Sequence, residues 1–386
     1  MMKRIATDFL DEMLRIKSYA PEEKQRCASV ILDMLTSMGF QGEIVHGFGS
    51  PIVIAEYDSK ADKNILFYSH YDVKPEGDMV AWNTEPFVPV YDEVSNKIYA
   101  RGTGDAKGQI FAMIYGIREA LLHSKTLSYN VTIVIEGDEE SGSVGLDDFC
   151  KARLRGKAYD AVIINDSHWF GERPVIYTGT RGQQSINIYY EVVGMCENQH
   201  AGNYGGRVIG AARKFINILL QILGQIDAVI ESALTTEEEY GNAVSLTHIS
   251  SGDSVRSTIP QKAFAKIDIR FIEIYVPQKI YHILEMAKTN YGITYEIIQQ
   301  EEGFYNQKDE VFIDSVNKII KGVTGLEPIH KRYSGAYIPM RCLRFVEGIK
   351  YVMPFAQADE HNHSPNENMS LRHIVYGIEI IKEMLI

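Results

Sequence analysis

Apolar residues recur at two different spacings in the first part of the chain. In residues 4–39 and 107–124 they return every three or four positions, which is the spacing of an amphipathic helix. Short apolar runs, which are typical of buried strands, occur in "PIVIAEY", "NILFYSH", "YNVTIVIEGDEESGS" and "YDAVIINDS". Because helices and apolar strands alternate, the pattern predicts an α/β domain with a mostly parallel sheet flanked by helices.

The pattern changes after about residue 178. The segments "GQQSINIYYEVVG", "VSLTHISSG" and "AFAKIDIRFIEIYV" alternate polar and apolar residues, as strands with one exposed face do. This alternation predicts an inserted α+β domain with an antiparallel sheet over residues 180–300. Helix and strand patterns return from about residue 304, so residues 1–179 and 301–386 are predicted to form one domain around the insert.

Composition narrows the possible partners and compartment. The 386 residues carry a net charge of -12, which argues against a nucleic-acid partner or an anionic membrane surface. The four cysteines show no paired spacing, which favours reduced thiols. The first residues are too acidic for a signal peptide, and no apolar run approaches membrane-spanning length. We therefore expect a cytoplasmic protein.

Ionisable residues stand where the predicted strands of the first domain end. Carboxyl ends of parallel strands are where α/β folds place their ligand sites, so these side chains are expected to converge. A further acid lies in the glycine-rich turn "RGTGDAKGQ" before a helix, and two histidines lie in "DEHNHSPNE". The set comprises His70, Asp72, Asp105, Glu139, Glu140, Asp166, His361 and His363.

Converging carboxylates would repel one another in a low dielectric, and a metal ion would remove that repulsion. Imidazole with carboxylate is the ligand set expected for Zn²⁺ or a similar divalent cation. The number of groups favours two ions that share a bridging carboxylate, which we assign to Asp105. We expect His70 and Asp166 to complete one site, and Glu140 and His363 the other.

Two acids remain beside these ligands. Asp72 is expected to orient His70 through the other ring nitrogen. Glu139 is not needed as a ligand, and a free carboxylate beside the metals is typical of a general base. His361 is the alternative to His363 as a ligand, and the sequence around "HSPNE" favours His363.

The segments "SHYDVKPEGD", "WNTEPF", "ARGTGDAKGQ", "EGDEESGS", "NDS" and "HSPNE" occur in the order of the signature segments of the M20 family of co-catalytic metallopeptidases, which this chain resembles over nearly its whole length. The form H-Y-D-V-x-P is nearest to the dipeptidase-like branch. The resemblance implies the same five ligands, with Glu139 as the base. It also implies a catalytic α/β domain interrupted by a lid domain that forms a homodimer.

The resemblance further implies four substrate contacts. His200 in "NQHAGNYGG" corresponds to a histidine that holds the substrate carbonyl oxygen, and Arg270 in "KIDIRF" to an arginine that grips a carboxylate. Ser334 and Gly335 begin "SGAYIP", which is similar to a loop over the substrate. The sequence departs from the family pattern in substrate contacts, at Ser257, Ala336 and Tyr337.

These features predict a di-zinc hydrolase of amide bonds in small peptide-like substrates, either a dipeptidase or a carboxypeptidase, with Co²⁺ or Mn²⁺ as alternatives to Zn²⁺. The first alternative is an N-acyl amino acid deacylase, such as a desuccinylase or a deacetylase, which would use the same metals and base. The second is an inactive binding homologue. It is disfavoured because all five ligand positions and Glu139 are present.

Overall fold

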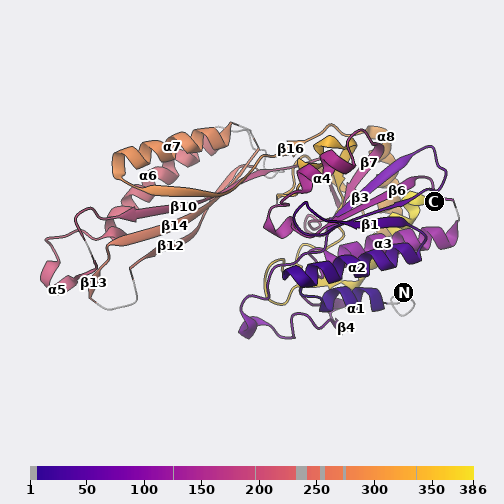
Figure 1. Cartoon of the computed structure of the whole chain (residues 1–386), viewed down its shortest axis with the longest axis horizontal. Coiled ribbons are helices and arrows are strands. Elements are labelled where there is room, and N and C mark those ends of the chain that lie inside the picture. The colour runs from indigo at the N-terminus through magenta and orange to yellow at the C-terminus, as the bar shows by residue number, and fades with distance from the viewer. Residues whose placement is uncertain are drawn as a thin grey trace. The chain divides into compact units, whose positions relative to one another are not determined.

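Eight strands form the central sheet of the first of two compact units in the computed structural model (Figure 1). The structure describes residues 7–124, 126–195, 197–231, 241–252, 257–272, 275–335 and 337–386. Unit 1 is Met1–Gly179 with Tyr305–Ile386, and unit 2 is Thr180–Phe304.

The strand order in unit 1 is β1-β2-β6-β3-β7-β18-β8-β17. The four central strands, β6, β3, β7 and β18, are parallel to one another, and β2 and β8 run antiparallel to their inner neighbours. The predicted α/β fold with a mostly parallel central sheet is therefore confirmed. The strands are β1 (Gln41–Val45), β2 (Ile52–Tyr57), β3 (Asn64–His70), β6 (Asn130–Glu136), β7 (Ala158–Ile164), β8 (Val175–Tyr177), β17 (Ile329–Lys331) and β18 (Glu347–Val352).

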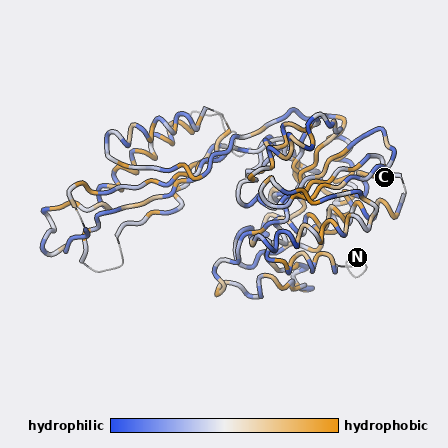
Figure 2. Tube along the Cα trace, viewed as in Figure 1, coloured by the Kyte–Doolittle hydropathy of each residue, from blue (hydrophilic) through white to orange (hydrophobic). Residues whose placement is uncertain are grey.

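Helices pack on this sheet and share one apolar core with it. Figure 2 shows that hydrophobic residues are concentrated in the central strands. Within the described ranges, no helix combines the length and apolar character needed to cross a bilayer. The helices of unit 1 are α1 (Asp8–Arg15), α2 (Pro21–Ser37), α3 (Lys107–His123), α4 (Leu146–Arg153), α8 (Glu310–Thr324) and α9 (Leu371–Leu385), with short 3₁₀ turns η2 (Met79–Ala81), η3 (Glu139–Ser141) and η4 (Cys342–Phe345).

Within the described residues, the predicted helical region 4–39 contains two helices, because the chain is extended at Ile16 and a proline begins the second helix. Pro21 is the first residue of α2, a position that its fixed φ favours, and it drives the preceding residue out of the helical region. Ala20 is accordingly extended. Helix α1 has already ended at Arg15, since Ile16 is extended as well. Shorter strands not resolved by the sequence pattern are β4 (Val90–Asp92), β5 (Lys97–Tyr99), β9 (Gly179–Thr180), β16 (Phe304–Tyr305) and β19 (Asn368–Ser370).

Unit 2 contains the antiparallel sheet that the polar–apolar alternation predicted. Its order is β12-β14-β10-β15, with every neighbouring pair antiparallel. One face of this sheet and two helices form a second apolar core. The elements are β10 (Gly182–Glu191), β12 (Ala243–Ser251), β14 (Lys262–Phe271), β15 (Thr294–Glu301), α6 (Ala211–Glu231) and α7 (Val276–Tyr291), with the short β11 (Gln199–His200), α5 (Ala201–Tyr204) and β13 (Thr258–Ile259).

Helices α3 and α9 approach each other closely because glycines stand at their contact. A Cβ on Gly116 of α3 would lie 2.6 Å from Cβ of Ile381 and 2.7 Å from the carbonyl oxygen of Ile378. A Cβ on Gly377 of α9 would lie 2.8 Å from Cβ of Ala112. These distances are shorter than van der Waals contact, so a larger residue would force the helices apart.

We predict that Gly116→Ala destabilises the protein by about 1–3 kcal/mol, although alanine is the better helix former, because the added methyl overpacks this contact. Gly322→Ala in α8 is the matched control. Nothing lies within 4 Å of its added Cβ, so it should stabilise the protein by up to about 1 kcal/mol. Thermal unfolding of both variants measures the difference, and equal melting temperatures would contradict the role of the glycine contact.

Candidate metal centre

The carboxyl-terminal edge of the unit 1 sheet brings the five predicted ligand residues together. His70 is the last residue of β3, Glu140 follows β6 in η3, and Asp166 follows β7. Asp105 precedes α3, and His363 lies in the segment after β18. They form two groups whose ligand atoms lie within 4.8 Å of one another and which share one carboxylate: His70, Asp105 and Asp166, and Asp105, Glu140 and His363.

The first group is buried. The imidazole Nε2 of His70 lies 2.9 Å from Oδ1 of Asp105 and 3.8 Å from Oδ1 of Asp166. The side chain of His70 is fully buried, yet this nitrogen has no hydrogen bond with suitable geometry among the described residues. A buried imidazole nitrogen that faces two carboxylates without a hydrogen bond is a donor set that fits a divalent metal ion.

The second group is more open. Nε2 of His363 lies 2.9 Å from Oε2 of Glu140 and 3.1 Å from Oδ2 of Asp105. The side chain of His363 is 47% exposed, whereas that of Glu140 is nearly buried. His361 is exposed and belongs to neither group among the described residues.

The side chains of the two ligand groups together favour positive charge at the carboxyl-terminal edge of the unit 1 sheet. Burial raises the pKa of Asp105, but the imidazoles of His363 and His70 beside its carboxylate outweigh burial and hold it below its usual value. Burial lowers the pKa of His363, whereas Asp105 and Glu140 raise it, to about 10. The pKa of His70 is raised in the same way by Asp105 and Asp166. The carboxylates therefore favour a cation, which is what a metal ion provides.

Asp72 connects the strand end to the acidic turn. Its carboxylate accepts hydrogen bonds from the backbone N–H groups of Glu139, at 3.2 Å, and Glu140, at 3.0 Å. Its Oδ1 is 3.4 Å from Nδ1 of His70, and the same ring nitrogen is 3.2 Å from the carbonyl oxygen of Asp72. Asp72 thus contacts the predicted partner, and it also fixes the backbone of the turn, which sequence reasoning missed.

Glu139 lies beside the two groups without belonging to either. Burial raises the pKa of its carboxyl well above the usual value; the charge of His70 opposes this shift, and the charges of Asp166 and Glu140 add to it.

The preceding residue, Asp138, holds the turn in place through its side chain. Its carboxylate accepts hydrogen bonds from Nζ of Lys24 at 2.7 Å and from the backbone N–H of Ser50 at 2.6 Å.

A buried ion pair supports the shared carboxylate, and it was not predicted. NH1 of Arg101 lies 2.7 Å from Oε2 of Glu367. The other oxygen, Oε1, accepts hydrogen bonds from the backbone N–H groups of Gly102 at 2.9 Å, Gly104 at 3.1 Å and Asp105 at 3.2 Å. Both partners lie in the motif segments "ARGTGDAKGQ" and "HSPNE", which was the available signal, but the motifs alone gave neither residue a role.

The predicted substrate residues lie in both units. His200 is an exposed residue of β11, opposite Thr258 of β13, and Arg270 lies in β14, where its Nε is 2.9 Å from Oδ1 of Asp268. Both residues belong to unit 2, whereas the two ligand groups belong to unit 1. Ser334 belongs to unit 1; it is buried, and its backbone N–H donates to the carbonyl of Gly179.

The adjoining loop is described in part. Gly335 follows Ser334 and is partly exposed, Tyr337 is buried, and Ala336 lies outside the described residues.

The remaining departure from the family pattern, Ser257, lies in unit 2 and has a positive φ of 60°. Neither of the described departures from the family pattern, Ser257 and Tyr337, belongs to the two metal-ligand groups.

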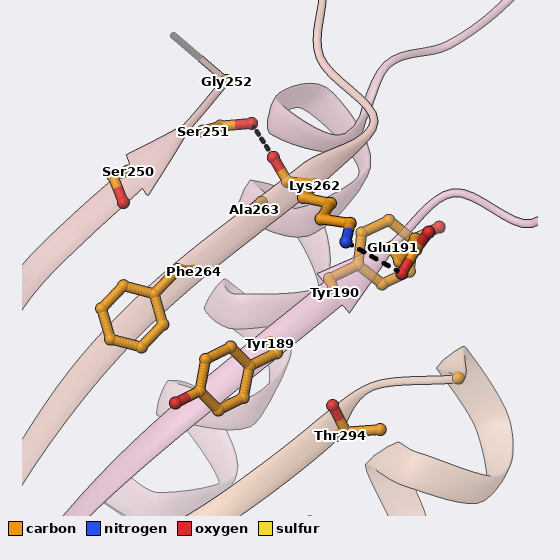
Figure 3. Close-up of a pocket in the computed structure, with 11 residues that line it drawn as sticks. Tyr189, Tyr190, Glu191, Ser250, Ser251, Gly252, Lys262, Ala263, Phe264 and Thr294 are labelled. Carbon is orange, nitrogen blue, oxygen red and sulfur yellow. Dashed lines mark hydrogen bonds and ion pairs between the residues drawn. The ribbon is translucent and has the colours of Figure 1, made fainter. Parts of the chain in front are cut away.

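A separate pocket of about 430 Å³ lies on the sheet of unit 2 (Figure 3). Tyr189 and Phe264 line it, with ring centroids 5.1 Å apart, and Lys262 forms an ion pair with Glu191 at its rim, at 3.8 Å. Its lining includes none of the predicted site residues. It therefore does not contribute to the predicted chemistry.

The imidazole–carboxylate groups fit a metal-dependent hydrolase, and sequence comparison identifies the family. The model described as Peptidase family M20/M25/M40 matches residues 66–386. The chain belongs to this family, and the predicted M20 membership is confirmed. As a member with dipeptidase relatives, it is a hydrolase that acts on peptide C–N bonds.

Individual relatives support this placement. The Cys-Gly metallodipeptidase DUG1 of Saccharomyces cerevisiae is 26% identical over 401 residues, covering 87% of this chain and 81% of the relative. The succinyl-diaminopimelate desuccinylase of Methylococcus capsulatus is 25% identical over 328 residues, covering 83% and 82%. A solved structure of the dipeptidase Dug1p from Saccharomyces cerevisiae has the same fold, with a TM-score of 0.78 at 24% identity, covering 97% of this chain and 94% of that one.

Proposed function

We propose that this chain is a two-metal dipeptidase that hydrolyses small peptides. The observation that carries the proposal is the pair of three-residue donor groups that share Asp105. Shared carboxylates are typical of two-metal hydrolases. The similarity to the Cys-Gly metallodipeptidase supports a dipeptide substrate.

We propose that His70 and Asp166 hold one ion, Glu140 and His363 the other, and that Asp105 bridges them. Zn²⁺ suits this mixture of imidazole and carboxylate, and Co²⁺ or Mn²⁺ suit it as well. When bound, the ions would polarise the substrate carbonyl and lower the pKa of water.

Glu139 is proposed as the general base. Its carboxylate lies next to a ligand residue and takes no part in either ligand group. In this role it removes the proton from the attacking water and delivers it to the leaving nitrogen of the cleaved peptide bond. Asp72 supports both functions, since it holds the backbone N–H groups of Glu139 and Glu140.

The substrate contacts are proposed from the family resemblance. His200 would hold the carbonyl oxygen as negative charge develops on it, and Arg270 would bind the free carboxylate of the substrate. To do so, Arg270 must exchange Asp268, its present partner, for the substrate. Ser334 and Gly335 would contact the substrate from their loop. We also propose that unit 2 acts as a lid and forms a homodimer.

The second candidate is removal of an acyl group from an N-acyl amino acid. The similarity to the succinyl-diaminopimelate desuccinylase favours it, and the same ligands and base would serve. The two functions differ in what lies on the acyl side of the cleaved bond: an amino acid with a free amine, or an acid such as succinate or acetate.

We predict that the metal-loaded protein hydrolyses dipeptides with a higher kcat/KM than N-succinyl or N-acetyl amino acids. Chelation should abolish the activity, and Zn²⁺, Co²⁺ or Mn²⁺ should restore it, because five ligand residues are shared by two ions. A panel of both substrate classes, assayed by release of free amine, measures the preference. Full activity in protein shown to be metal-free by elemental analysis would contradict the two-metal proposal.

A pair of variants separates the base from its neighbouring ligand. Glu139→Gln should retain both ions and lose at least about 10²-fold in kcat, the usual scale for a lost general base. Glu140→Gln should lose metal occupancy as well as activity. Metal content and kcat are measured on the same preparations. The opposite result, in which only Glu139→Gln loses metal, would exchange the two assignments.

The proposed homodimer predicts that the subunits share their active sites. If His200 serves the partner's metals, His200→Ala should bind both ions and be nearly inactive. Co-expression of differently tagged His200→Ala and Glu139→Gln chains should recover activity, since one site of the heterodimer would combine Glu139 of one chain with His200 of the other. Verified heterodimers that stay as inactive as either parent would restrict His200 to its own subunit.

A further inference from the structure

Lys74 lies against one of the two ligand groups. It follows Asp72 by two residues in the segment after β3. Its ammonium Nζ is 3.1 Å from Oε2 of Glu140 and also donates a hydrogen bond to the carbonyl oxygen of the same residue. The Lys74 side chain is 36% exposed, so the ammonium stands between solvent and the nearly buried Glu140 carboxylate.

The two groups therefore differ in their charged neighbours. Oε2 of Glu140 is the oxygen that lies 2.9 Å from Nε2 of His363, so one carboxylate oxygen serves both the ligand group and the ammonium. In the other group, the ion pairs of Asp105 and Asp166 within the described ranges are with imidazoles and include no lysine or arginine.

We propose that Lys74 weakens the binding of the metal ion held by Glu140 and His363, and so makes this the weaker and more readily exchanged of the two ions. The proposal rests on the ligand set proposed above. Lys74 acts through Glu140 as a positioning residue, since it competes with the ion for the same carboxylate oxygen.

The size of the effect follows from Coulomb's law. An ion bound to Oε2 of Glu140 lies about 2 Å beyond an oxygen that is 3.1 Å from the ammonium, so the two cations are at most about 5 Å apart. A divalent and a monovalent charge at that separation repel enough to change a binding constant on the order of tenfold, even with the dielectric screening of bulk water.

A purely structural role predicts the opposite sign. If Lys74 mainly held the Glu140 backbone through its carbonyl, removing the ammonium would loosen the ligand and weaken metal binding. Electrostatic competition predicts that removing the ammonium strengthens it. The direction of the change in the binding constant therefore separates the two roles.

The test is a titration of the metal-free protein with Zn²⁺ at buffered free concentrations, with occupancy measured by elemental analysis after dialysis. We expect two binding steps in the unsubstituted protein. In Lys74→Met the weaker step should tighten at least about tenfold, and the tighter step should change less. Lys74→Arg keeps the charge and should stay within about threefold. In 1 M salt the difference between Lys74→Met and the unsubstituted protein should shrink, because salt screens an exposed charge.

Lys17→Met is the matched control. It removes one positive charge from a side chain of unit 1 that is 52% exposed and lies near Glu76, at 4.0 Å, rather than near a ligand. It should leave both steps unchanged. Fewer than two ions in the unsubstituted protein would overturn the ligand set itself. If two ions bind and the weaker binding step is unchanged or weakened in Lys74→Met, only the role of Lys74 is overturned. If Lys17→Met tightens that step as much as Lys74→Met does, the effect comes from the net charge of the protein and the role of Lys74 is again overturned.

Discussion

The buried ion pair between Arg101 and Glu367 is the interaction on which the position of Asp105, the carboxylate shared by the two candidate ligand groups, depends. The carboxylate of Glu367 accepts hydrogen bonds from three backbone N–H groups of the turn that ends in Asp105. The guanidinium of Arg101 also donates to the carbonyl of Pro75 at 3.2 Å and lies 5.3 Å from the ring of Trp82. One pair thus connects four motif segments, three within residues 69–109 and the fourth at residues 363–367. Loss of either partner would leave a buried charge without compensation, which typically costs about 3–5 kcal/mol.

The convergence of the ligands follows from the sheet. Parallel β3, β6 and β7 end at one edge, so residues that follow them must meet there. This is why the apolar strand pattern, read with His70, Glu140 and Asp166, predicted the fold class and a common location for the acids. The inserted antiparallel sheet was predictable for a related reason, since its strands alternate between a buried and an open face.

What the sequence did not predict depends on contacts between distant segments. Glu367 meets Asp105 across 262 residues, and Lys74 meets Glu140 across 66. No periodicity predicts such pairs, because Glu367 and Lys74 look like ordinary charged residues in their own segments. The break between α1 and α2 was visible in Pro21, but the helical spacing on both sides concealed it. The proposed substrate contacts rest on resemblance, and two of them, His200 and Arg270, belong to a second unit with its own core.

The insertion of unit 2 also constrains the order in which unit 1 can form. Strand β18, in the last 40 residues of the chain, lies between β7 and β8 in the middle of the sheet, and α9 completes the core against α3. During synthesis from the ribosome, β7 would therefore present an unpaired, apolar edge until unit 2 has been made and β18 emerges. Such edges promote aggregation. The nascent chain is then most vulnerable between the two halves of its own sheet, and His363 arrives last, so that the second ligand group is complete only when folding is nearly finished.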